Sequence, residues 1–154
     1  MFITRLCMVL LLVGIVVSLP HEALSQKKMK SGKVLWAADD IKWDSLKGAP
    51  PGSGVMGSTL WGNPEKGPFG MFVKFPAGFN MPLHYHSNTL KAVVIKGAYI
   101  YVSPTGEEKP LGPGSYFVEP AMDHHGTKGA ADSETIFYVE SSGKFDAVPI
   151  EEKK

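Results

Sequence analysis

Residues 78–97 read GFNMPLHYHSNTLKAVVIKG, and this stretch decides the fold. A glycine opens the stretch and another closes it, with two histidines and a run of β-branched residues between them. Side chains alternate between the two faces of a strand, so His84 and His86 share one face and Tyr85 points to the other. Two imidazoles at this spacing are able to converge on one metal ion. The alternative is a pair of exposed or hydrogen-bonded histidines on an outer face.

Short apolar runs of the same kind recur along the chain, separated by turn signals rich in glycine and proline. They are rich in the aromatic and β-branched residues that favour strands. We expect strands at residues 34–37, 55–61, 69–75, 90–97, 98–102, 115–120 and 134–140. The sequence predicts no amphipathic helix of four turns or more. Many short strands at this spacing are typical of an all-β sandwich or barrel.

A second histidine pair, His124 and His125, follows in the segment GPGSYFVEPAMDHHG. The chain has five histidines, and the remaining one, His21, lies near the N-terminus. Two tight pairs on two separate strand-rich segments are hard to explain by core packing. Metal sites are commonly built from ligands that the fold brings together from separate elements, so this distribution favours a metal centre.

Both histidine segments resemble the sequence motifs of the cupin superfamily, G-x5-H-x-H-x3,4-E-x6-G and G-x5-P-x-G-x2-H-x3-N. The positions that match in register are Gly78, His84, His86, Gly97, Gly114, Pro120 and His125. The resemblance covers roughly residues 55 to 142 and selects His125, rather than His124, as the third imidazole. The surrounding sequence is similar to the small DUF4437 cupins and to the cupin half of ChrR-type anti-sigma factors.

The chain departs from these motifs at three positions. Leu90 stands where the first motif has its glutamate, so the carboxylate of the usual cupin centre is missing. Met122 stands at the glycine of the second motif, which is costly for Met if that turn needs a positive φ angle. Gly129 replaces the final asparagine. The centre would consist of imidazoles alone unless another side chain folds in, the candidates being Asp123, Glu119 and His124.

The resemblance implies a fold, a cofactor and partners. The fold is expected to be an all-β cupin double-stranded β-helix, a jelly-roll barrel in a single domain. His84, His86 and His125 are expected to bind one divalent transition metal, with Zn, Fe, Mn, Ni and Cu all open. The partner is expected to be a small-molecule ligand or substrate, and a homodimer is implied because cupins commonly pair.

Other side chains have two readings each. His124 is a candidate acid–base group, because imidazole titrates near neutral pH; alternatively it is a hydrogen-bonded loop histidine. Asp123 either orients a ligand imidazole or caps a turn. Leu90, Ala92 and Val94 share the histidine face if the strand from His84 continues unbroken. One of Tyr99 and Tyr101 is a candidate to line the same cavity, although aromatic residues more often belong to a core.

Two classes of function remain open at the level of sequence. In the first, the chain is an exported metalloenzyme, a dioxygenase- or isomerase-type protein acting on a small oxygenated molecule. In the second, it is a non-catalytic module that binds or senses a metal or ligand. An empty centre, as in degenerate cupins, is a third case, which the retained three-histidine register argues against. The fold does not decide between these classes, because the cupin barrel carries many activities.

The N-terminus predicts export. Arg5 precedes an apolar run over residues 6–19, and small residues at 23 and 25 form a cleavage signal, the layout of a secretory signal peptide. The alternative is a retained anchor, but the run is shorter than the ~20 residues that span a bilayer. We expect a periplasmic or secreted protein that leaves the membrane after cleavage. The net charge of +1 indicates no nucleic-acid partner.

The remaining chain is the size of one domain. We divide the sequence into a signal peptide (1–25), an N-terminal segment with an edge strand (26–50), a cupin barrel (51–145) and a C-terminal tail (146–154). The single cysteine, Cys7, lies within the signal peptide, so no disulfide is expected to brace the mature domain.

Overall fold

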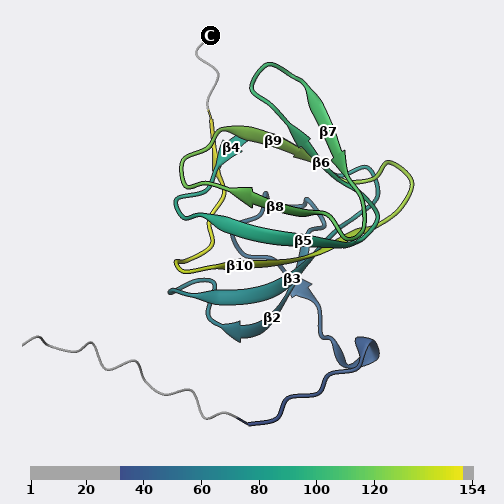
Figure 1. Cartoon of the computed structure of the whole chain (residues 1–154), viewed down its shortest axis with the longest axis vertical. Helices are drawn as coiled ribbons and strands as arrows, with labels where there is room; N and C mark the ends of the chain where they lie inside the picture. The colour runs from purple at the N-terminus through teal and green to yellow at the C-terminus, as the bar shows by residue number, and fades with distance from the viewer. Residues whose placement is uncertain (1–31, 151–154) are drawn as a thin grey trace, which may run out of the picture. The chain divides into compact units, whose positions relative to one another are not determined.

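The computed structural model describes residues 32–150, and the expected signal peptide lies outside this range. Two antiparallel sheets form the barrel (Figure 1). The first sheet has the order β1 (Asp44–Ser45), β2 (Met56–Gly62), β3 (Phe69–Phe75), β10 (Thr135–Ser141), β5 (Leu90–Lys96) and β8 (Tyr116–Glu119). The second has the order β11 (Val148–Pro149), β4 (Asn80–Tyr85), β9 (His125–Lys128), β6 (Tyr99–Val102) and β7 (Glu108–Leu111).

One hydrophobic core lies between the sheets. Strand β10 buries alternate residues along its length and β3 does so from Met71 onward, as strands with one face toward a core do. Phe75 is central to the core, because its ring stacks on Phe79 at 4.2 Å and meets Phe137 edge-on at 4.9 Å. The only helical element among residues 32–150 is the short 3₁₀ turn Ala38–Asp40. This all-β architecture with two antiparallel sheets confirms the expected jelly roll.

The structure differs from the sequence prediction at several elements. Residues 34–37 form no strand. Val34, Leu35 and Trp36 are apolar, yet each is more than half exposed within the described part of the chain. Strands β7 and β9 went unpredicted because their sequences, EKPL and HGTK, are polar or contain Pro and Gly. Strand β11 lies within the expected C-terminal tail and pairs with β4, so the barrel extends past residue 145.

No helix among the described residues has the length and apolar character needed to cross a membrane.

Met122, at the position of the cupin motif's glycine, has a positive φ angle, which the sequence left open. Its φ is 65°, and it is the only non-glycine residue with positive φ among residues 32–150. Its N–H donates to the carbonyl oxygen of His86, which ties this turn to the end of the first histidine segment. A left-handed conformation costs a side-chain-bearing residue about 1–2 kcal/mol, so Met122 carries local strain.

Replacing Met122 with glycine is therefore expected to stabilise the protein. The glycine relieves the strain but also loosens the unfolded chain, which leaves a net gain of about 0.5–1 kcal/mol in the free energy of unfolding. Urea denaturation of the purified variant measures it. Gly97→Ala is the control of opposite sign, since φ there is 71° and an added Cβ would lie 2.4 Å from the carbonyl oxygen of Glu134. A Met122→Gly protein less stable than wild type would contradict this reading.

Candidate metal centre

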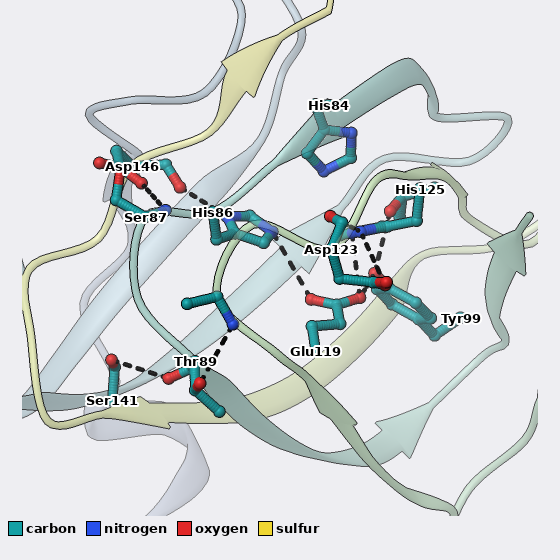
Figure 2. Close-up of polar contacts among 12 residues, drawn as sticks. His84, His86, Ser87, Thr89, Tyr99, Glu119, Asp123, His125, Ser141 and Asp146 are labelled. Atoms are coloured by element: carbon teal, nitrogen blue, oxygen red, sulfur yellow. Dashed lines mark hydrogen bonds and ion pairs between the residues drawn. The ribbon is translucent and has the colours of Figure 1, made fainter. Parts of the chain in front are cut away.

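Three histidines from two neighbouring strands meet inside the barrel. His84 lies on β4 and is the direct cross-strand partner of His125, the first residue of β9. His86 follows β4 by one residue on the same face. One ring nitrogen from each of the three lies within 4.8 Å of the others, and we call this group the histidine cluster. Figure 2 shows the three rings around a common space.

Each ring of the histidine cluster is held by a backbone carbonyl at its Nδ1 atom. The partners are Pro82 for His84 (2.8 Å), Asp146 for His86 (2.5 Å) and Asp123 for His125 (3.2 Å). A carbonyl oxygen only accepts, so all three Nδ1 atoms carry the proton and all three Nε2 atoms keep a free lone pair. This arrangement fixes tautomer and ring orientation, as it does for metal-binding histidines.

Burial keeps the cluster neutral. His84, His86 and His125 are 2%, 6% and 0% exposed. Burial lowers the pKa of His84 to about 4. Burial also lowers the pKa of His125 and that of His86, in the latter case against the attraction of a nearby carboxylate, Glu119. The three imidazoles are therefore neutral at pH 7, which is the form that binds a metal ion.

Glu119 is the acidic side chain that the structure brings to the cluster. It is 4% exposed, with Oε1 lying 3.2 Å from His125 Nε2 and Oε2 lying 3.5 Å from His86 Nε2. Tyr99 donates a hydrogen bond to it from within the core. Burial raises the pKa of Glu119 and raises that of Tyr99 well above its ordinary value. Of the three side chains that the sequence left open as substitutes for the missing carboxylate, Glu119 is the one beside two of the histidines.

The cluster fits a bound cation. His125 Nε2 is buried and has no hydrogen-bond partner among residues 32–150. Leaving a buried polar atom unpaired costs about 1–3 kcal/mol, so such atoms call for an explanation. A divalent ion bound by His84, His86 and His125 would satisfy this lone pair with the ligand type that transition metals prefer.

His124 lies apart from the cluster. It is exposed, and its ring stacks on Tyr85 at 5.7 Å, on the face that points away from the interior. Asp123 holds His125 through its backbone carbonyl, while its carboxylate lies 3.9 Å from the same Nδ1 atom. Asp123 also donates its N–H to Pro120, so it takes part in a turn as well.

The interior cavity beside the cluster is small. Its volume is about 50 Å³, and His84, His86 and Glu119 line it together with apolar core residues. Tyr99, Leu90 and Ala92 also line it, although β4 ends before β5 begins and the strand from His84 is not continuous. A larger hollow of about 810 Å³ lies at the surface beside Trp36 and Phe145, and the histidine cluster is not part of its lining.

Comparison with known structures supports the same barrel. The polyketide cyclase RemF from Streptomyces resistomycificus superposes with a TM-score of 0.66 at 16% identity, over 80% of this chain and 89% of that one. An RmlC-like cupin protein from Ralstonia eutropha gives 0.61 at 22% identity, over 79% and 76%. The Rhodobacter sphaeroides SigE complex with the anti-sigma factor ChrR gives 0.52 at 20% identity, over 68% and 50%. At these identities the likeness concerns the fold.

The sequence comparison identifies the family. No curated protein matches the sequence. A family model described as a domain of unknown function, DUF4437, matches residues 21–148, which is most of the chain. This match agrees with the all-β barrel, the two histidine segments and the cupin-like structures. The chain therefore belongs to the DUF4437 family, and its barrel has the cupin fold.

Proposed function

We propose that the protein is an exported metal-binding cupin whose histidine cluster holds one divalent transition ion and presents it to a small oxygenated molecule. The observation that supports it best is the common state of the three rings. Each is buried and neutral, each is held at Nδ1 by a carbonyl, and their ligand atoms lie within 4.8 Å of one another. Ordinary core packing does not require three neutral imidazoles to bring ring nitrogens this close together.

The chain's own residues have defined parts in this proposal. His84, His86 and His125 would hold the ion, while Pro82 and Asp146 would orient two of the rings through their carbonyls. When bound, a divalent ion acts as a Lewis acid that polarises an oxygen of the ligand or lowers the pKa of bound water. The apolar core residues around the cavity would exclude bulk water and strengthen those electrostatic interactions.

An enzyme of the dioxygenase or isomerase type is one form of this function. RemF, a polyketide cyclase with a similar barrel, is an example of an enzyme built on this fold, and the fold by itself specifies no activity. The role of His124 as an acid–base group stays a prediction, since its ring is stacked on the outer face.

The cavity favours the second candidate, a module that binds or senses without turnover. Pockets for drug-sized ligands have volumes of roughly 300–1,000 Å³. The space beside the cluster is about 50 Å³, enough for a few water-sized molecules. A larger substrate would require the barrel mouth to open, whereas a metal ion with one or two small ligands fits without rearrangement.

Export and self-association are also proposed. The signal-like sequence at residues 1–25 supports export. A patch on the outer face of β5 and β8 supports a homodimer, because four apolar side chains there are exposed and two of them, Val93 and Tyr116, are direct cross-strand partners. The other two members are Ile95 and Val118.

Metal analysis of the mature protein, purified from its native compartment, tests the proposed function. We expect about one divalent transition ion per chain and, by intact mass, a chain that starts at Gln26. With free metal at about 1,000 times the dissociation constant, binding is expected to add about 4 kcal/mol to the free energy of unfolding. Metal-free protein whose melting temperature does not respond to Zn²⁺, Mn²⁺, Fe²⁺, Ni²⁺ or Cu²⁺ would refute the proposal. Native zinc would count against a dioxygenase, and oxygen uptake would count against a purely binding role.

A further inference from the structure

The first cupin motif lacks its carboxylate in this chain, but the structure brings another carboxylate, that of Glu119, close to the same place. Leu90 stands at the motif's glutamate position on β5, and its direct antiparallel partner is Glu119 on β8. Directly paired residues project to the same face with Cβ atoms about 4.5–5.5 Å apart. Both side chains are 4% exposed and line the same cavity. An acidic group therefore enters the centre from the strand adjoining the expected one.

We propose that Glu119 is the fourth protein ligand of the centre, supplying from β8 the carboxylate that Leu90 cannot supply from β5. This inference rests on the proposed function, in which the histidine cluster holds a metal ion. Figure 2 shows Glu119 reaching toward His86 and His125 from the side of the cluster opposite His84.

The contacts of Glu119 with the histidines require a positive species between them. Both Nδ1 atoms donate to carbonyls, so the Nε2 atoms of His86 and His125 present lone pairs. The two oxygens of Glu119 also present lone pairs, and they lie 3.5 Å and 3.2 Å from those nitrogens. Acceptors that face one another inside a low-dielectric core repel unless a cation or a proton lies between them. A single proton satisfies one of the two contacts, whereas an ion bound by all three side chains satisfies both.

The surroundings of Glu119 orient it toward the cluster. Tyr99 O–H donates its only proton to Oε1 of Glu119. The 2.9 Å contact between the hydroxyls of Tyr99 and Thr127 is therefore donated by Thr127. All three residues are less than 5% exposed. A buried hydrogen-bonded relay of this kind fixes the orientation of a metal-binding carboxylate, as outer partners do in known metal sites.

A carboxylate ligand changes what the centre binds. Three neutral imidazoles leave the full 2+ charge on the ion, whereas Glu119 reduces the net charge to 1+ and adds an oxygen donor. Oxygen donors suit harder ions such as Mn²⁺ and Fe²⁺, so the fourth ligand widens the range beyond what imidazoles alone favour.

Metal affinity of the mature chain and its Glu119→Gln variant tests the inference. Titration with Co²⁺ and Mn²⁺ gives the dissociation constants, and the Co²⁺ absorption spectrum reports the coordination. We expect Glu119→Gln to weaken binding at least about 100-fold, the upper end of the loss seen when an outer partner is removed. Glu140→Gln is the matched control, because Glu140 is a half-buried carboxylate on β10 that also accepts a tyrosine hydrogen bond, from Tyr138 at 3.0 Å. It should leave affinity and spectrum unchanged.

A double variant tests whether a carboxylate at position 90 and one at position 119 reach the same centre. In Leu90→Glu with Glu119→Leu, the carboxylate moves to the motif position, and we expect affinity within about tenfold of wild type and a restored Co²⁺ spectrum. A folded Glu119→Gln protein that binds within about threefold of wild type overturns the inference while leaving the three-histidine site standing. Wild-type protein that binds neither ion overturns the inference together with the proposed function.

Discussion

The His125→Ala protein is expected to lose most of its metal. The His125 ring is fully buried, its Nε2 atom has no hydrogen-bond partner within the described part of the chain, and a bound cation would occupy that lone pair. Removing one of three imidazoles leaves two, which rarely hold an ion tightly. We expect the dissociation constant to rise at least about 100-fold, equivalent to about 3 kcal/mol of binding free energy.

His124→Ala is the matched control for this prediction. It deletes the adjacent imidazole, which is exposed and stacked on Tyr85 on the outer face, so metal content should stay close to one ion per chain. Dialysis against a metal buffer followed by elemental analysis compares the two variants under equal free metal. His84→Ala and His86→Ala are expected to behave like His125→Ala. An equal loss in His124→Ala would mean that the centre uses the other member of the pair.

Acid is expected to destabilise the metal-free protein well above the range in which ordinary carboxylates protonate. The pKa of His84 falls from 6.5 in the unfolded chain to about 4 in the fold, and burial also lowers the pKa values of His86 and His125. Between pH 6.5 and pH 4 the unfolded state therefore binds more protons than the folded state. The free energy of unfolding has its full value above about pH 6.5 and falls as the pH is lowered toward 4.

The size of the acid effect follows from linkage. His84 alone, which is 2% exposed, accounts for about 2–3 kcal/mol lost between pH 7 and about pH 4.5. Glu119 acts in the opposite direction, because its raised pKa lets the fold take up a proton as pH falls. Urea midpoints measured in chelator across this range check the prediction. His84→Asn should reduce the pH dependence of stability by about one proton, and a wild-type stability that does not change across this range would contradict the prediction.

The barrel and the three-histidine set were predicted from the spacing of the cupin motifs, whereas strand periodicity alone reaches only the first histidine pair. Alternation places His84 and His86 on one face, and motif spacing separates His125 from His124. The prediction of a strand at residues 34–37 was wrong because apolar composition does not say whether a partner strand exists. Strand β9 was missed because its small and polar residues carry no strand pattern, even though it holds His125.

The position of Glu119 could not be predicted because it depends on the register between β5 and β8. From the sequence, Asp123, Glu119 and His124 were the candidates to join the three imidazoles where the motif's glutamate is missing. Only the pairing of Leu90 with Glu119 distinguishes them, and register between strands far apart in the chain is not encoded in either strand alone. For Met122 the cupin motif left open whether its turn needs a positive φ angle, and the structure shows that it does.

The hydrogen bond from His86 to the carbonyl of Asp146 joins the cluster to the segment just before β11, which follows all three histidines in the chain. During synthesis all three imidazoles emerge before the residue that locks one of them in place. A growing chain would therefore carry the proposed ligands without the finished pocket, and tight capture of an ion would wait for β11 to dock. An ion held by the proposed centre would then be drawn from the surroundings in which Asp146 and β11 complete folding, whatever ions the nascent polypeptide met earlier.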